Sequence, residues 1–335
     1  MTRKVGPAPV LRVEELRVQF AQAERDSEAL PAVDGLSFAL HVGEVLAIVG
    51  ESGCGKSATA LALMGLLPRS AQVDGSVRFA GTEILGANEK QLTQIRGAQI
   101  SMIFQDPLSA LNPVLTIGLQ LTEVLRKHLQ LNRKDARARA IELLEEVGIP
   151  DPQQRFGEYP HQLSGGMRQR VMIAIAIACE PQILIADEPT TALDTTIQAQ
   201  ILELLQRIAA ERSMSVILIT HDLGVVAGMA DRVLVMYGGR VVEAASRHDL
   251  FRAPMHRYTN GLLNSLPRLD AAQPHRLDAI PGSAFDRQAW ASACAFANRC
   301  SFATTACHSP DIPFEELRPN HEVRCLHPAK GPKHA

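Results

Sequence analysis

The sequence has no long apolar run and almost no net charge. Its longest uninterrupted apolar stretch, residues 171–179, covers about half of the roughly 20 residues that cross a bilayer. The net charge of −2, from 34 basic and 36 acidic residues, provides no general field that would attract nucleic acid or anionic lipid. We therefore expect no membrane-spanning segment. Nucleic acid or anionic lipid could be bound only through a local patch of charge.

Cysteine and secretory features are also scarce. Six cysteines in 335 residues are too few for a fold built on disulfides. The opening residues lack the apolar region of roughly 7 to 15 residues that marks a secretory signal. With 46% apolar and 21% charged residues, the composition excludes a disordered or collagen-like chain and is typical of one large or two ordinary globular domains. These features predict a protein that stays in the cytoplasm.

Strand and helix patterns alternate along most of the chain. Apolar or alternating stretches predict strands at residues 11–20, 36–50, 76–79, 100–104, 183–186, 216–220, 233–236 and 240–243. Helical patterns cover residues 56–67, 119–147, 166–179 and 195–212. This alternation predicts an α/β fold with a mostly parallel sheet and flanking helices. After about residue 253 proline recurs and the periodicity fades, which predicts a separate, loop-rich extension.

A glycine-rich motif joins a predicted strand to a predicted helix. It fits G-x-x-x-x-G-K-[ST], whose backbone N–H groups point at phosphate oxygens. Lys56 would pair with the β- and γ-phosphates, and Ser57 would ligate Mg²⁺. A glycine-rich turn with an accidental lysine is the alternative, and the flanking strand and helix argue against it. The predicted ATP-binding residues here are Gly50, Glu51, Ser52, Gly53, Cys54, Gly55, Lys56, Ser57 and Ala58.

Two further segments carry side chains suited to nucleotide chemistry. Asp187 and Glu188 follow a buried strand, where Asp187 would hold Mg²⁺ and Glu188 would act as general base. Taken alone, they could equally be a surface acidic pair. Ser164, Gly165 and Gly166 open a helix and predict a second anion-binding helix N-terminus. A helix N-terminus can also lower the pKa of a thiol such as Cys54. The alternative is that Cys54 is simply a small residue at that position of the loop.

With the motif Leu163-Ser-Gly-Gly-Met167, the chain resembles the ATP-binding subunits of ABC transporters. The resemblance implies a P-loop ABC ATPase core at residues 10–252, with an antiparallel β subdomain and a helical subdomain at about 107–180. It also implies a dimer in which the signature residues of one protomer close over the ATP of the other. Further roles implied by the resemblance fall on Gln105 (Q-loop, Mg²⁺ and attacking water), Asp194 (D-loop), His221 (γ-phosphate switch) and Phe20 (stacking on adenine). Phe20 packed in the core is the alternative to that last role.

The segment from Ala253 to Pro267 is similar to the A-P-x-H-x-Y-T-x-x-L-L-x-S-x-P segment of oligopeptide and dipeptide importer ATPases. That branch implies ATP-driven peptide uptake through two multi-span permease subunits, a second ATPase subunit, identical or paralogous, and an extracytoplasmic solute-binding protein. It places the chain peripherally on the cytoplasmic face of the inner membrane. Nickel, glutathione or another small solute is the alternative cargo. A soluble ABC ATPase acting on nucleic acid and a P-loop kinase fit the motifs less well.

Four cysteines lie in the extension, spaced C-x5-C-x6-C-x17-C: Cys294, Cys300, Cys307 and Cys325. Four thiolates suit an iron–sulfur cluster or Zn²⁺, but structural zinc sites usually show closer cysteine pairs. Similar importer tails carry a 4Fe-4S cluster, so the resemblance implies one here, with Zn²⁺ or plain reduced thiols as alternatives.

Overall fold

The computed structural model describes residues 8–20, 30–191, 193–265, 280–282, 294–308 and 312–329. Residues 266–279 and 283–293, within the expected extension, lie outside the described part. The chain divides into two compact units. Unit 1 is built mainly from Leu40–Glu44 and Gly86–Ile219, and unit 2 from Val10–Ala39, Val45–Leu85 and the chain from Thr220 onward.

Unit 1 contains three parallel strands, with β7 (Ile183–Asp187) between β6 (Ile100–Ile103) and β8 (Ser215–Thr220). All residues of these strands are buried, which explains their continuous apolar sequences. Pairing in register brings the carboxyl ends of the strands to one edge, where Asp187 lies opposite Ile219. Parallel pairing was predicted, and these strands confirm it.

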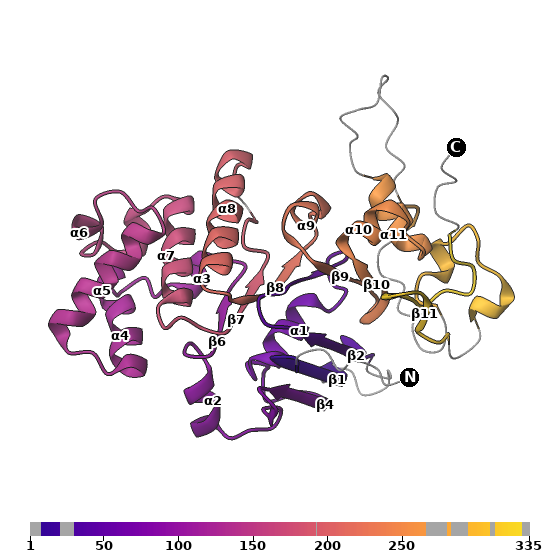
Figure 1. Ribbon diagram of the computed structural model, residues 1–335, viewed down its shortest axis with the longest axis horizontal. Helices are drawn as coiled ribbons and strands as arrows, with labels where there is room; N and C mark the ends of the chain where they lie inside the picture. The colour runs from indigo at the N-terminus through magenta and orange to yellow at the C-terminus, as the bar shows by residue number, and fades with distance from the viewer. Residues whose placement is uncertain are drawn as a thin grey trace. The chain divides into compact units, whose positions relative to one another are not determined.

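The helices of unit 1 include a group in which α4, α5, α6 and α7 pack against one another (Figure 1). The long helix expected at residues 119–147 is wrong, because Gln130 adopts a left-handed backbone with φ of 55° and Asn132 caps a new helix. The helices of this unit are α2 (Glu89–Ile95), α3 (Pro107–Ala110), α4 (Ile117–Leu129), α5 (Arg133–Glu146), α6 (Pro152–Arg155), the 3₁₀ turn η1 (Pro160–Gln162), α7 (Gly165–Ile177) and α8 (Thr195–Glu211).

Unit 2 contains a sheet in the order β2-β1-β4-β5, in which β4 pairs antiparallel with both β1 and β5. Its strands are β1 (Leu11–Phe20), β2 (Val33–Leu40), β4 (Ala71–Phe79) and β5 (Thr82–Glu83). The strand pattern at residues 36–50 forms two strands, β2 and β3 (Val45–Val49), separated by a turn in which the N–H of His41 donates to the Glu44 carboxylate over 2.8 Å.

A second set of strands in unit 2 runs in the order β11-β12-β10-β9-β3. β3 and β9 (Arg232–Tyr237) are parallel, whereas β10 (Arg240–Ser246) pairs antiparallel with both β9 and β12 (His321–Val323). β11 (Glu315–Arg318) completes a hairpin with β12. Residues near the end of the chain therefore add strands beside β10, which the fading periodicity of the sequence did not predict.

The helices of unit 2 are α1 (Lys56–Leu63), α9 (Leu223–Met229), α10 (Arg247–Arg252), α11 (Arg257–Asn264) and the 3₁₀ turns η3 (Ala297–Arg299) and η4 (Thr305–His308). Helix α1 stops before the predicted end at residue 67, because Gly65 takes a positive φ of 59° ahead of Pro68. We call the described residues from 253 onward the C-terminal module. Its Tyr258 and Phe296 are buried in a hydrophobic core shared with β3, β9, β10 and α9.

Candidate nucleotide site

The phosphate loop, residues 50–57, connects β3 to α1 and depends on glycine at two positions. A Cβ on Gly50 would lie 2.2 Å from the carbonyl oxygen of Met236, and one on Gly55 would lie 2.2 Å from that of Ala32. Gly55 also has a φ of 103°, a conformation that other residues rarely adopt. Sterics therefore require glycine at both positions.

Lys56 lies at the start of α1 and is 5% exposed. Its ammonium donates hydrogen bonds to the carbonyl oxygens of Gly50 at 2.8 Å and Glu51 at 3.0 Å. The loop thus folds around a buried cation, with Ser52 and Gly53 exposed at its rim. A buried cation beside N–H groups at a helix N-terminus is an environment that favours a phosphate anion.

Cys54 behaves differently from the expectation for a thiol at a helix start. Burial raises its pKa above the ordinary value, and the nearby Lys56 ammonium offsets this only in part. The lowering that a helix N-terminus can cause does not prevail here, because the thiol is buried and loses the hydration that would stabilise a thiolate; this agrees with the alternative of a small residue that fits the loop. Cys54 is a protonated packing residue.

In unit 1, Asp187 ends β7 with 4% exposure, and Glu188 follows in a left-handed conformation with φ of 47°. The Glu188 carboxylate accepts hydrogen bonds from Nε2 of Gln105 at 3.1 Å and from the hydroxyl of Thr191 at 2.9 Å. The structure therefore brings together Gln105 and Glu188, two residues that the sequence predicts for the water-activating group. A left-handed backbone at a non-glycine residue is a strained feature that clusters at functional sites.

The signature residues open α7. Ser164 is its N-cap and accepts a hydrogen bond from the N–H of Met167 at 3.3 Å, and both Ser164 and Gly165 are exposed. A Cβ on Gly166 would lie 2.9 Å from the side chain of Ile197, so this glycine also permits close packing of α7 against α8. Asp194 caps α8 by accepting from the N–H of Ile197 at 3.0 Å. A signature and a D-loop role for these residues remain predictions.

The other predicted contacts lie in unit 2. His221 is exposed directly after β8, before the cap residue Asp222 of α9. Phe20, the last residue of β1, is 37% exposed, so it is not fully buried in the core. Val33 is buried at the start of β2 and lies beside the loop, 3.3 Å from where a Cβ on Gly55 would be. Stacking of Phe20 on adenine stays a prediction.

The four tail cysteines, all free thiols, line one small cavity together with His256 and Phe296. Burial raises the pKa of Cys294 to about 11, and Cys325, Cys307 and Cys300 add to the rise. The cavity measures about 10 Å³, room for about one water. Within the described part of the chain, no three His, Cys, Asp or Glu side chains are close enough to hold a metal ion.

Sequence reasoning missed the residues that attach the C-terminal module. Glu243 on β10 is fully buried, and its carboxylate accepts from the N–H groups of Met255 and His256 and contacts Nε2 of His321 at 2.7 Å. Arg299 of the module pairs with Glu51 of the phosphate loop. The pairs Glu243–His321 and Glu51–Arg299 are 78 and 248 residues apart in sequence, and no local pattern marks either pairing.

Comparison with known proteins identifies the family. The ABC transporter family matches residues 33–191, and the family described as the C-terminal region of oligopeptide/dipeptide transporters matches residues 242–307. The chain is 50% identical to the dipeptide transport ATP-binding protein DppD of Bacillus subtilis over 97% of both chains. The chain belongs to the ABC transporter ATPase family. This confirms both the resemblance and the fold class inferred from the motifs.

Other ABC ATPases sharpen the comparison. The oligopeptide transport ATP-binding protein OppD of Mycobacterium tuberculosis is 50% identical over 95% of this chain, which spans about half (52%) of that relative's length. A dimeric structure of MJ0796, an ATP-binding cassette bound to ADP and Pi, matches 71% of this chain and 98% of its own with a TM-score of 0.63 and 28% identity. Within the described residues, no helix has both the length and the apolar character to cross a membrane.

Proposed function

We propose that this ABC ATPase hydrolyses ATP to drive uptake of di- or oligopeptides through separate membrane subunits. The single observation that carries the cargo class is the match of residues 242–307 to the C-terminal region of oligopeptide/dipeptide transporters. Relatives named for dipeptide and oligopeptide transport, about half identical over nearly the whole chain, support it. We further propose that the ATPase domain covers residues 10–252 and that the importer-type extension begins at 253.

The residues present fit Mg²⁺ and ATP. Lys56 and the phosphate loop would hold the phosphates, with Ser57, Asp187 and Gln105 as the Mg²⁺ ligands. Mg²⁺ supplies charge neutralisation at the phosphates. Glu188, held by Gln105 and Thr191, accepts the proton of the attacking water. His221 donates toward the γ-phosphate, and Phe20 stacks on the base.

The partners follow from the same proposal. Because the family works as dimers, exposed Ser164 and Gly165 with Gly166 would face the nucleotide of a second ATPase subunit. Asp194 would lie at the same contact. Two permease subunits and an extracytoplasmic solute-binding protein would complete the importer and hold the chain on the cytoplasmic face of the inner membrane. No nucleic acid is among the proposed partners.

The complex, reconstituted in vesicles with its permease subunits and binding protein, provides the test. We expect ATP-dependent accumulation of labelled di- and oligopeptides, abolished by Glu188→Gln in this chain. Nickel and glutathione serve as competing cargoes in parallel vesicles. Accumulation of one of these instead of peptide would contradict the proposed cargo while preserving the ATPase role.

We propose in addition that Cys294, Cys300, Cys307 and Cys325 bind a 4Fe-4S cluster. Four thiols that line one cavity match its ligand chemistry. Among the described residues no three of them lie close enough to hold a metal ion, so binding would require the thiols to rearrange around the cluster. Protein purified without oxygen should absorb at about 400 nm, as thiolate-bound clusters do, and Cys300→Ser should remove the band, whereas Cys179→Ser should keep it. Colourless protein with one zinc per chain would favour Zn²⁺, and metal-free protein with four titratable thiols would refute both metals.

A further inference from the structure

The second residue of the phosphate loop, Glu51, is held by the C-terminal module. The two terminal nitrogens of Arg299 donate to the two carboxylate oxygens of Glu51, at 2.7 and 3.2 Å. The N–H of Glu51 donates to the hydroxyl of Tyr258 on α11 at 2.8 Å. Two side chains more than 200 residues away in sequence thus hold one residue of the loop.

The pairing of Arg299 with Glu51 is largely shielded from water. The side chain of Arg299 is 8% exposed and that of Glu51 23%, while Tyr258 is fully buried. Burial alone would lower the pKa of Arg299, but hydrogen bonds to Glu51 and Tyr237 raise it above its ordinary value. A two-pronged arginine–carboxylate contact that is partly buried fixes geometry better than a fully exposed ion pair does.

Glu51 connects this contact to the lysine of the loop. Its carbonyl oxygen accepts from Lys56, its N–H goes to Tyr258, and its carboxylate goes to Arg299. Because the N–H is directed at Tyr258, it is not offered to a phosphate. Glu51 therefore acts by setting the orientation of the peptide that holds the Lys56 ammonium.

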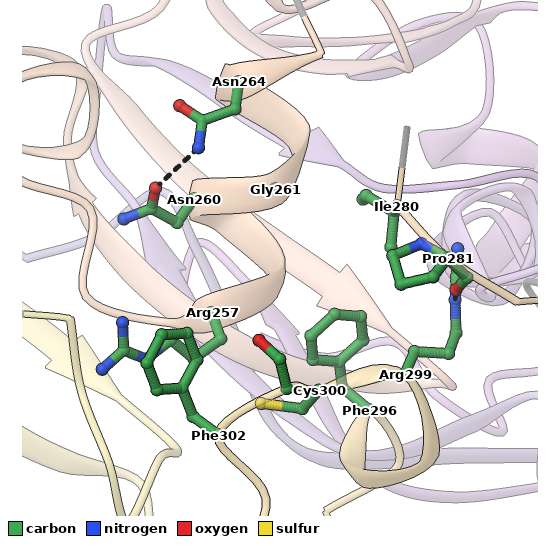
Figure 2. A pocket seen from close by; sticks show the side chains of 11 residues that line it. Arg257, Asn260, Gly261, Asn264, Ile280, Pro281, Phe296, Arg299, Cys300 and Phe302 are labelled. Atoms are coloured by element: carbon green, nitrogen blue, oxygen red, sulfur yellow. Dashed lines mark hydrogen bonds between the residues drawn. The ribbon is translucent and has the colours of Figure 1, made fainter. Parts of the chain in front are cut away.

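Arg299 is itself anchored within the module. It ends the 3₁₀ turn η3 between two tail cysteines, with the N–H of Ala297 donating to Cys294 O at 2.8 Å and the N–H of Cys300 donating to Ala297 O at 3.1 Å. Its Nε donates to the carbonyl of Pro281 at 2.8 Å. Figure 2 shows Arg299 beside Pro281, with Phe296 and Cys300 bordering the same pocket. The position of this turn therefore sets the position of the guanidinium.

We propose that Arg299 and Tyr258 are positioning residues for ATP binding, so that the C-terminal module is a working part of the nucleotide site. The inference rests on the proposed ATP-binding role of the phosphate loop. It has a reciprocal consequence, since a module that improves ATP affinity must in turn be stabilised by bound ATP to the same extent.

A double-mutant cycle on the full-length chain tests the proposal. We compare Glu51→Gln, Arg299→Met and the double variant for Mg-ATP affinity by calorimetry and for KM and kcat. Each single change should raise the dissociation constant and KM about tenfold, with kcat changed less than about twofold. The double variant should be no weaker than either single one, because both remove the same contact. Additive losses would overturn the proposal.

Conservative variants separate positioning from folding. Arg299→Lys, which keeps the charge, should recover part of the affinity, and Tyr258→Phe, which keeps the buried ring but loses the hydroxyl acceptor, should weaken binding about threefold. Arg318→Met, at an exposed position on β11, is the matched control and should bind as the parent does.

Lys56→Ala distinguishes failure of the positioning role from failure of the proposed phosphate site itself. If it abolishes ATP binding while Arg299→Met and Tyr258→Phe bind normally, the positioning role is wrong and the phosphate site stands. If Lys56→Ala binds ATP normally, the proposed phosphate site fails, and the positioning role fails with it.

Discussion

The phosphate loop and the C-terminal module lie in the same compact unit, yet they are held by different kinds of interaction. The loop is shaped by its own backbone, with glycine where a Cβ would collide and a lysine bonded to carbonyls five and six residues before it. The module is held by contacts between distant residues, chiefly Arg299 with Glu51 and His321 with Glu243. A local motif can be recognised in the sequence, whereas a contact between distant residues can be recognised only in the folded structure.

The same difference separates the residues that are expected to act on the nucleotide from the residues that hold the site in place. Residues at the loop and at the end of β7 are expected to act on the nucleotide, so their loss should reduce turnover or binding directly. Residues of the module act through packing and orientation. Substitutions in the two regions should therefore differ both in size and in the quantity that changes.

The largest effect is expected from Glu188→Gln. The amide keeps the shape of the side chain but cannot accept the proton of water, and general-base catalysis contributes about 10²- to 10⁴-fold. We expect ATP hydrolysis to fall by that factor while ATP binding persists. Steady-state hydrolysis and equilibrium binding on the same preparation provide the measurement. Turnover close to that of the parent would remove Glu188 from the catalytic role.

Lys56→Ala should act on binding before chemistry. Removing the ammonium deletes charge-assisted hydrogen bonds worth about 1.5 to 3 kcal/mol, which corresponds to roughly 10- to 100-fold weaker ATP binding. Calorimetric titration with Mg-ATP measures the loss. Arg318→Met, at an exposed position on β11, is the control. Unchanged affinity in Lys56→Ala would contradict the interpretation of the loop.

The sequence predicts much of the phosphate loop and of the buried parallel strands, because glycine spacing and continuous apolar runs are local signals. It fails where tertiary contacts decide. The break between α4 and α5 depends on the left-handed backbone of Gln130. Glutamine is not a residue type that predicts such a turn. Strand β12 has only three residues, which is too short for a recognisable periodicity. It is held in the sheet by pairing with β10.

The residues of the candidate site also fall into those marked by local motifs and those found only through tertiary contacts. The motifs predict Gln105 and Glu188 as site residues, and the structure places them in hydrogen-bond contact. Glu51 was included only as a variable position of the loop motif, and Arg299 was not singled out. An arginine next to a cysteine carries no signal of its own, so its carboxylate partner could be found only from the fold.

The smallest effect concerns His256, which tests how the module is attached. Burial lowers its pKa from about 6.5 to about 4, with Glu243 opposing and Arg257 adding to the shift, so the folded protein keeps the imidazole neutral. The unfolded chain binds the proton more readily, hence this contribution is complete above pH 6.5 and is lost as the pH falls toward 4. At pH 5.5 the loss should be about 1.4 kcal/mol, or tenfold in the opening equilibrium of the module.

His256→Asn isolates this titration from that of other groups. The imidazole Nδ1 accepts from the N–H of Tyr258 at 3.1 Å as the N-cap of α11, and asparagine is a strong N-cap without a charge to gain. Hydrogen exchange of α11 amides at pH 6.5 and 5.5, corrected for intrinsic rates, gives the opening free energy. Between these two pH values the parent should lose about fivefold in protection, or about 1 kcal/mol of opening free energy, and the variant should lose less by that factor. Equal losses in both proteins would mean that His256 is not the group through which acid loosens the module.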